Sequence, residues 1–283
     1  MLKRIISALV AMVIGVSALI IDKTVVYLVL ISLFSGIGTF ELIRAIKCEK
    51  HRFLTCFCVI FALAIPSLLT FDFMRPFWVM ACLVYIMVLL VVMLAMHKKI
   101  KFVEIAACGS AGIAIPISLS CIIFVRNLPW YADGGYFPGV FMVVYMLFCA
   151  WIGDTGAYFV GTFFGKHKLC PEISPKKTVE GLIGGIVLVG IVVTIQCLVY
   201  NLLLPTEEMY KMNYALLIPI GMAASVTGVL GDLSMSVIKR QYDVKDFGNV
   251  MPGHGGILDR FDSVLFVAPF IYVVYSFVSP LMK

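Results

Sequence analysis

Nine long stretches of this 283-residue chain carry almost no charge, and they limit the folds that the chain can adopt. Each is long enough to cross the roughly 30 Å hydrocarbon core of a bilayer as a helix. Only 13% of the residues are charged, whereas soluble domains carry about 25%. The sequence therefore predicts an all-α, polytopic integral membrane protein, a helical bundle of about nine transmembrane helices. We place these spans at residues 5–21, 24–43, 53–71, 76–96, 103–125, 136–157, 181–204, 213–237 and 261–282.

Basic residues are distributed unevenly between the two sides of this predicted bundle. With the N-terminus in the cytoplasm, 17 Lys and Arg residues fall on the cytoplasmic side and 5 fall on the other. Basic loops stay preferentially on the cytoplasmic side of a membrane. The sequence therefore predicts a multi-pass protein of the cell membrane whose two polar loops, 161–180 and 238–260, face the cytoplasm. The net charge of +6 reflects this topology and an anionic leaflet, and we expect no nucleic-acid partner.

The chain changes in character near residue 150. Residues 1–150 are predicted to be N-terminal transmembrane helices that serve as a scaffold and in packing and lipid access. Glu41 ends the second span, and its position near Arg44 favours a simple interfacial ion pair over a functional role. Residues 151–283 are predicted to be the catalytic region, because polar residues gather there at span ends and in the two long loops.

The first of these loops suits a polyphosphate. Asp154 falls late in the sixth span, at a depth where a carboxylate is costly and indicates a functional site. Glycines around it, such as Gly153 and Gly156, permit close helix packing. Lys166 and Lys168 are best explained as topological anchors, whereas the lysines farther along are flanked by hydroxyl groups. The substrate-binding candidates of this region are Asp154, Ser174, Lys176, Lys177, Thr178 and Glu180.

The second loop lies between residues that predict a cation site. If the eighth span continues to about residue 240, Asp232, Ser236 and Lys239 share one helix face. Asp259 and Asp262, three residues apart at the start of the ninth span, also share a face. We expect Asp232 and Asp259 to clamp one cation, since Mg²⁺ takes one or two carboxylates and completes its shell with substrate phosphates.

Each residue of the second region also has a simpler explanation. His254 could be an ordinary loop histidine, Lys239 and Arg240 a cytoplasmic collar, and Arg260 part of a capping network. Together, however, the carboxylates, the basic residues and a Gly-His-Gly-Gly turn whose amides can approach an anion favour a site. The sequence therefore predicts metal-assisted phosphoryl or nucleotidyl transfer at a membrane surface.

The same residues resemble a known signature. Ser236-x-x-Lys239-Arg240, then Lys245-Asp246, then Pro252-x-His254-Gly255-Gly256-x-x-Asp259-Arg260-x-Asp262 resembles that of the phosphatidate cytidylyltransferases, or CDP-diacylglycerol synthases. Asp154-Thr-Gly-Ala-Tyr158 and Ser174-Pro-Lys-Lys-Thr-x-Glu180-Gly181 resemble that family's second block. At Met251 the family usually has Leu, Ile or Phe. A motif with this many fixed positions is far less prone to chance matches than a single Gly-rich box.

The resemblance implies an enzyme of phospholipid biosynthesis that transfers CMP from CTP to phosphatidate, giving CDP-diacylglycerol and pyrophosphate. It implies Mg²⁺ as the cofactor, held by Asp232 and Asp259, and the sequence does not decide whether a second, monovalent cation takes part. The residues with expected catalytic roles are Lys239, Arg240, Lys245, Asp246, His254 and Asp262. The expected substrate-binding set is completed by Ser236, Gly255, Gly256 and Arg260.

Two other functions stay open on the sequence alone. A CTP-dependent lipid kinase, or another membrane nucleotidyltransferase, would use a similar phosphate clamp. An ion-coupled secondary transporter would explain Asp154 and Asp232 near span ends, although no inverted repeat is visible and the polar residues lie on one side. The sequence leaves the acyl-chain preference and a homodimer undecided.

Overall fold

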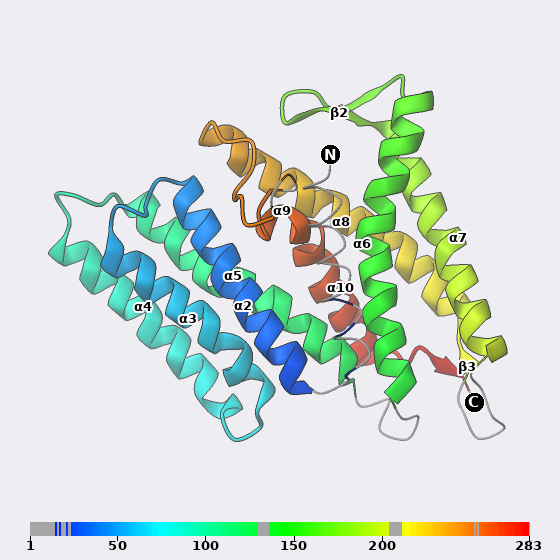
Figure 1. The fold of residues 1–283 in the computed structure, drawn as a ribbon, viewed down its shortest axis with the longest axis horizontal. Helices are drawn as coiled ribbons and strands as arrows, with labels where there is room; N and C mark the ends of the chain where they lie inside the picture. The colour runs from blue at the N-terminus through cyan, green and yellow to red at the C-terminus, as the bar shows by residue number, and fades with distance from the viewer. Residues whose placement is uncertain are drawn as a thin grey trace. The chain divides into compact units, whose positions relative to one another are not determined.

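The computed structural model describes residues 24–128, 136–203, 211–251 and 255–282, together with Gly15, Ser17, Ile21 and Gly253. These residues are predominantly helical, which confirms the predicted fold class (Figure 1). The long helices are α2 (Thr24–Ala45), α3 (Arg52–Thr70), α4 (Trp78–Ala95), α5 (Phe102–Arg126), α6 (Tyr136–Phe164), α7 (Val179–Leu203) and α8 (Tyr214–Gln241).

Seven helices in the described part of the chain are long and apolar enough to cross a membrane. They coincide with the predicted spans from 24–43 to 213–237, and the protein is a multi-pass membrane protein. A 3-10 turn, η1 (Arg75–Phe77), precedes α4 and extends the third of these spans. The predicted span 5–21 lies outside the described residues except for three isolated positions, and the orientation of the N-terminus stays a prediction.

The ninth predicted span, 261–282, is not one continuous helix. It is divided into α9 (Leu258–Phe261), α10 (Val264–Phe277) and a short strand, β4 (Leu281–Met282). Asp262 and Ser263 form the turn between the two helices, where Oδ1 of Asp262 accepts the N–H of Ser263 at 2.8 Å. Such a local side-chain bond competes with the helical bonds of the backbone, which the hydropathy of the segment does not reveal.

The chain forms two compact units. Unit 1 comprises Met1–Ile123 and Gln241–Phe261, and unit 2 comprises Phe124–Arg240 and Asp262–Lys283. The predicted division at residue 150, between a scaffold and a catalytic region, concerns function and not compactness, and it stays a prediction. The segment that follows α8 nevertheless belongs to the same unit as the N-terminal helices, so these helices support part of the predicted site.

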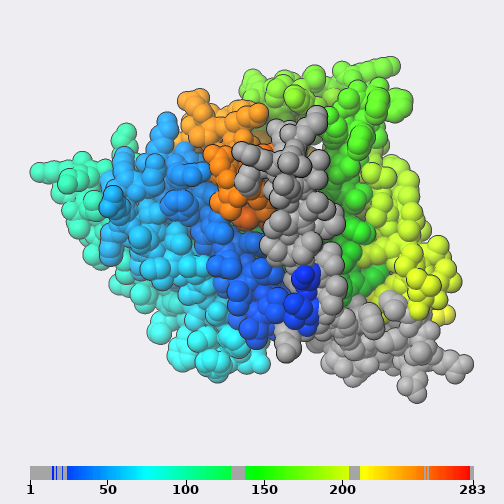
Figure 2. All heavy atoms as spheres, in the orientation of Figure 1, coloured from blue at the N-terminus to red at the C-terminus, as the bar shows by residue number. Residues whose placement is uncertain are grey.

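Unit 1 is built around α2, α3 and α5. The side chain of Thr39 on α2 donates to the carbonyl oxygen of Ala111 on α5 at 3.4 Å. The ring of Tyr85 on α4 stacks on Phe61 of α3 with 4.0 Å between centroids. Much of α4, drawn in cyan in Figure 2, exposes large apolar side chains, as expected of a helix that faces lipid.

Unit 2 contains two helices that pack closely, α6 and α7, with a strand pair beyond their ends (Figure 1). A Cβ atom at Gly185 of α7 would lie 2.6 Å from the carbonyl oxygen of Gly153 on α6, so only glycine fits at this contact. The glycines of α6 were predicted to permit such an approach. On α8, the carbonyl oxygen of Leu217 accepts the hydroxyl of Tyr145 at 2.8 Å. A second strand pair joins β3 (Lys211–Met212) to β4.

Candidate active site

The segment between α6 and α7 is more ordered than the predicted loop 161–180. Helix α6 continues to Phe164, and β1 (Lys168–Cys170) then pairs antiparallel with β2 (Ser174–Thr178). Helix α7 follows directly, beginning at Val179. The strand pair turns two sequence-adjacent lysines in different directions: Lys176 is exposed, whereas Lys177 is partly buried.

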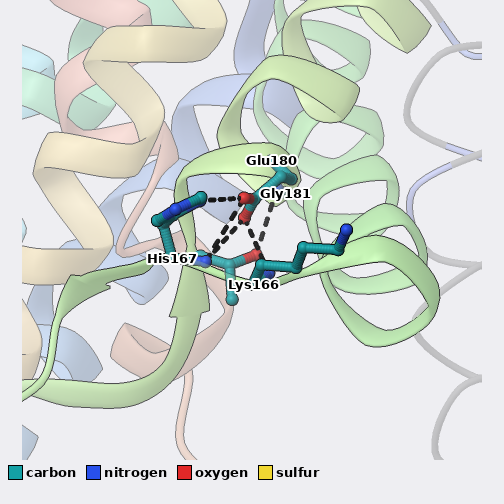
Figure 3. Close-up of polar contacts among 5 residues, drawn as sticks. Lys166, His167, Glu180 and Gly181 are labelled. Carbon is teal, nitrogen blue, oxygen red and sulfur yellow. Dashed lines mark hydrogen bonds and ion pairs between the residues drawn. The ribbon is translucent and has the colours of Figure 1, made fainter.

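Two of the predicted substrate-binding residues have clear local contacts at the start of α7. Thr178 is buried, and its Oγ1 accepts the N–H of Gly181 at 3.1 Å, as an N-terminal capping side chain does. The Glu180 carboxylate accepts the backbone N–H groups of Lys166 and His167, and its Oε1 lies 2.6 Å from Nδ1 of His167 (Figure 3). These contacts close the strand pair at its base, and contact of Thr178 or Glu180 with a substrate stays a prediction.

Lys177, in the first polar region of the sequence, contacts a residue of the second polar region. Its ammonium group forms an ion pair with the carboxylate of Asp232 on α8. The prediction that Asp232 and Ser236 share a helix face is confirmed, because the Ser236 hydroxyl donates to Oδ1 of Asp232 at 3.4 Å. Farther along α8, Nε of Arg240 donates to the carbonyl oxygen of Ile173, in the turn between β1 and β2, at 3.4 Å. The end of α8 and the strand pair are therefore held together.

Two further carboxylates lie near this ion pair. The hydroxyl of Ser263 donates to Oδ2 of Asp154 at 2.6 Å, which joins the start of α10 to α6. Asp262 is buried, and the negative charges of Asp232 and Asp154 both repel its carboxylate, while Lys239 attracts it. Unit 2 therefore concentrates negative charge where two lysines partly compensate for it, a setting that favours a bound cation. Sequence reasoning missed Ser263, since no local pattern marks it.

The remaining motif residues lie in unit 1, between α8 and α9 and in α9 itself; residues 242–261 form the motif segment. Oδ2 of Asp259 accepts the backbone N–H groups of Phe247 and Gly256, at 2.8 and 3.0 Å. The φ angles of Gly253 and Gly255 are +81° and +87°, a region that side chains other than glycine rarely adopt. Gly253 and Gly255 of the predicted Gly-His-Gly-Gly turn are therefore required by the backbone. Lys245, Asp246 and Arg260 are exposed at its borders, and His254 lies outside the described residues.

Glu41 has partners other than the one expected. Its carboxylate accepts the backbone N–H groups of Ile257 and Leu258, while Arg44 donates to the carbonyl oxygen of Phe247 at 3.1 Å. The charge of Arg44 does act on the Glu41 carboxylate, but the hydrogen bonds of both side chains go to the motif segment, which the expected interfacial pair did not include. No sequence pattern near Glu41 indicates these contacts, because their partners lie more than 200 residues away.

The clamping of one cation by Asp232 and Asp259 stays a prediction, since these residues belong to different units. Among the residues that the structure describes, no three His, Cys, Asp or Glu side chains already converge as metal ligands. The carboxylates nevertheless fit a hard divalent cation by their chemistry, since oxygen ligands are those that Mg²⁺ prefers.

The fold and these residues define a class: a multi-pass membrane protein with carboxylates and lysines gathered for the chemistry of phosphate groups. The chain belongs to the cytidylyltransferase family, whose model matches residues 2–278, which confirms the resemblance seen in its motifs. It is 37% identical over 282 residues to the phosphatidate cytidylyltransferase of Bacillus subtilis (strain 168), and the match covers 99% of each chain.

Two further relatives carry the same name. The chain is 43% identical over 140 residues to the phosphatidate cytidylyltransferase of Staphylococcus aureus (strain COL), with 48% of this chain and 49% of the relative covered. The enzyme of Staphylococcus haemolyticus (strain JCSC1435) is 43% identical over 136 residues, with the same coverage.

Proposed function

We propose that this protein is a phosphatidate cytidylyltransferase, which transfers CMP from CTP to phosphatidate and releases pyrophosphate. The observation that carries the proposal is the meeting of the two motif regions in unit 2. Lys177 from the strand pair and Asp232 from α8 form an ion pair, with Asp154 and Asp262 close enough to add their charges. The full-length likeness to the Bacillus subtilis enzyme supports the choice of CTP and phosphatidate as substrates.

The reaction needs little acid–base chemistry. The headgroup of phosphatidate is a phosphomonoester with a second pKa near 6, so it is largely dianionic at neutral pH and is itself the nucleophile. One of its oxygens forms a bond to the α-phosphorus of CTP, and the bond from that phosphorus to the bridging oxygen breaks. The electron pair of the broken bond leaves with pyrophosphate.

The main obstacle is repulsion between two polyanions. Catalysis therefore consists mostly of positioning the substrates and neutralising their charge. We assign this task to cationic side chains of the two motif regions. They are Lys176, Lys177, Lys239, Arg240 and Lys245.

A divalent cation completes this account. Mg²⁺ is proposed as the cofactor, with Asp232 and Asp259 as its protein ligands and Asp246 and Asp262 as further ligands or as partners of those ligands. When bound, it would neutralise triphosphate oxygens and the developing charge on the leaving group. In the described structure Lys177 compensates Asp232, and the same ammonium group is suited to a phosphate of CTP once the carboxylate has another cationic partner.

The site is proposed to face the cytoplasm, where CTP and Mg²⁺ are available. The distribution of 17 basic residues on one side and 5 on the other supports this topology. The acyl tails of phosphatidate would enter laterally between helices, because the headgroup must reach the strand pair and the inner ends of α8 and α10 while the tails stay in lipid.

One assay tests the activity directly. The purified protein in detergent is given CTP, MgCl₂ and phosphatidate, and both pyrophosphate release and the lipid product are measured. We expect pyrophosphate and CDP-diacylglycerol in equal amounts, and neither product when phosphatidate is omitted. A parallel reaction with diacylglycerol separates the alternative: a CTP-dependent lipid kinase would form phosphatidate and CDP there. That outcome, or the absence of CDP-diacylglycerol, would overturn the proposal.

A further inference from the structure

Glu41 is a buried carboxylate at the C-terminal end of α2, with only 1% of its surface exposed. Its Oε1 accepts the N–H of Ile257 at 3.2 Å, and its Oε2 accepts the N–H of Leu258 at 2.8 Å. Burying a carboxylate is costly unless its charge is stabilised by hydrogen bonds. Both oxygens of Glu41 are stabilised by backbone groups that directly precede Asp259.

Two glycines of the motif segment make room for this carboxylate. A Cβ atom at Gly248 or at Gly256 would overlap the carboxylate oxygens of Glu41, so neither position can carry a side chain while Glu41 stays in place. Neither glycine has a positive φ angle. The absence of a side chain therefore serves the approach of Glu41 rather than an unusual backbone conformation.

The same segment is fixed at its other end. The peptide N–H of Phe247 donates to Oδ2 of Asp259 at 2.8 Å, and the carbonyl oxygen of Phe247 accepts Nη2 of Arg44 at 3.1 Å. Helix α2 thus contacts this segment at two places: Arg44 binds Phe247, and Glu41 binds Ile257 and Leu258. Oδ2 of Asp259 accepts two backbone N–H groups of this segment, those of Phe247 and Gly256.

We propose that Glu41 is a positioning residue of the active site: it fixes the backbone at Ile257 and Leu258 and thereby orients the next residue, Asp259, toward its cation. The proposal rests on the proposed function for its catalytic consequence, and on the contacts of unit 1 for its geometry. It makes an N-terminal helix a determinant of cation affinity. A carboxylate is required at this position because two N–H donors converge on it, and an amide side chain would present its own NH₂ group to one of them.

The test compares Glu41→Gln with Glu104→Gln. Glu104 belongs to the same unit, but its carboxylate accepts the N–H of Lys101 and pairs with Lys50 rather than with the motif segment. Two quantities are measured in detergent: hydrogen exchange of the backbone amides of residues 257 and 258, and the Mg²⁺ concentration that gives half-maximal CDP-diacylglycerol synthesis. Thermal unfolding is followed for both variants.

In Glu41→Gln we expect these amides to exchange about tenfold faster or more, because a hydrogen bond to a charged group is lost. We expect the half-saturating Mg²⁺ concentration to rise by about the same factor, with a smaller loss of turnover at saturating Mg²⁺. Glu104→Gln should leave both quantities unchanged. If Glu41→Gln lowers stability and turnover while half-saturation by Mg²⁺ stays at the wild-type value, Glu41 has a structural role only and the proposal is overturned.

If Glu41→Gln does not fold, a second pair of variants tests whether Glu41 positions the motif segment. Gly248→Ala should disturb the segment because its new methyl group meets Glu41, and should again accelerate exchange of the amides of residues 257 and 258. Combined with Glu41→Ala, which removes the obstructing carboxylate, Gly248→Ala should add no further effect. Full additivity of the two changes would overturn the proposal.

The two proposals fail in different ways. Wild-type protein that makes no CDP-diacylglycerol would overturn the proposed function, while the exchange measurements would still report on the contact of Glu41 with the motif segment. Conversely, unchanged exchange in an active enzyme would overturn the role of Glu41 alone.

Discussion

Replacing Lys177 by alanine tests the meeting of the two motif regions. The Lys177 ammonium pairs with Asp232, and the side chains are only 21% and 24% exposed. Asp154 and Asp262 lie near enough to Asp232 for their charges to act on one another. Lys177→Ala therefore removes a cation from a cluster of three carboxylates and, under the proposed function, a contact with the phosphates of CTP.

The expected loss of activity in Lys177→Ala follows from the burial and the charges of this ion pair. One preorganised charge contact in a transition state is commonly worth about 10²–10³-fold in rate. Since the pair is partly exposed, solvent screens it, and we expect the lower end, a loss of about 10²-fold in kcat/KM. The effect on the free energy of unfolding should be small, about 1 kcal/mol or less, for the same reason.

A neighbouring lysine serves as the control. Lys168 in β1 is exposed, and the sequence explains it by membrane topology. Initial rates of CDP-diacylglycerol formation are measured against CTP concentration for Lys168→Ala, for Lys177→Ala and for Lys177→Arg, which keeps the charge. Lys168→Ala should retain nearly full activity. Equal and small losses in Lys168→Ala and Lys177→Ala would refute the assignment of Lys177 to the site.

Other predictions concern the cation, the helix packing and the topology. Asp259→Asn should abolish turnover while the protein inserts and purifies normally, and activity within a few-fold of wild type would remove Asp259 from the proposed metal site. Gly185→Ala should lower the melting temperature in a detergent unfolding assay, since its methyl group meets the carbonyl oxygen of Gly153 and overpacking costs about 1–3 kcal/mol. An unchanged melting temperature would contradict that packing. In sealed inside-out vesicles external CTP should be consumed and EDTA should stop the reaction, whereas consumption in sealed right-side-out vesicles would contradict the topology.

The membrane fold could be read from the sequence because hydropathy and helix length are properties of continuous segments. The seven long apolar helices begin and end within a few residues of predicted spans, apart from α6, which continues to Phe164. The strand pair between α6 and α7 was missed, since residues 168–178 lack the alternation of apolar and polar residues that marks a strand. The turn at Asp262 and Ser263 was missed because it depends on one hydrogen bond within an otherwise apolar stretch.

In the site, too, contacts between residues close in sequence could be predicted, whereas contacts between distant segments could not. The contact of Ser236 with Asp232 follows from their spacing of four on a helix, and the structure confirms it. The contacts of Asp154 with Ser263 and of Glu180 with His167 depend on how separate segments pack. The sequence could place these residues in a polar region, but it could not say which polar atoms they would satisfy.

Glu41 shows that functional residues of a membrane protein cannot be found only by looking for segments rich in polar residues. Sequence reasoning gave weight to regions where many ionisable residues gather, and a single carboxylate near an arginine was given the simplest partner. Yet burying a charge costs free energy whether or not other charges lie nearby in the sequence. A single carboxylate in an apolar span therefore needs hydrogen-bond donors of its own. For Glu41 these donors are backbone N–H groups of the motif segment. An isolated buried charge therefore points to a long-range contact, and its partner should be sought wherever the chain exposes backbone N–H groups that no helix satisfies.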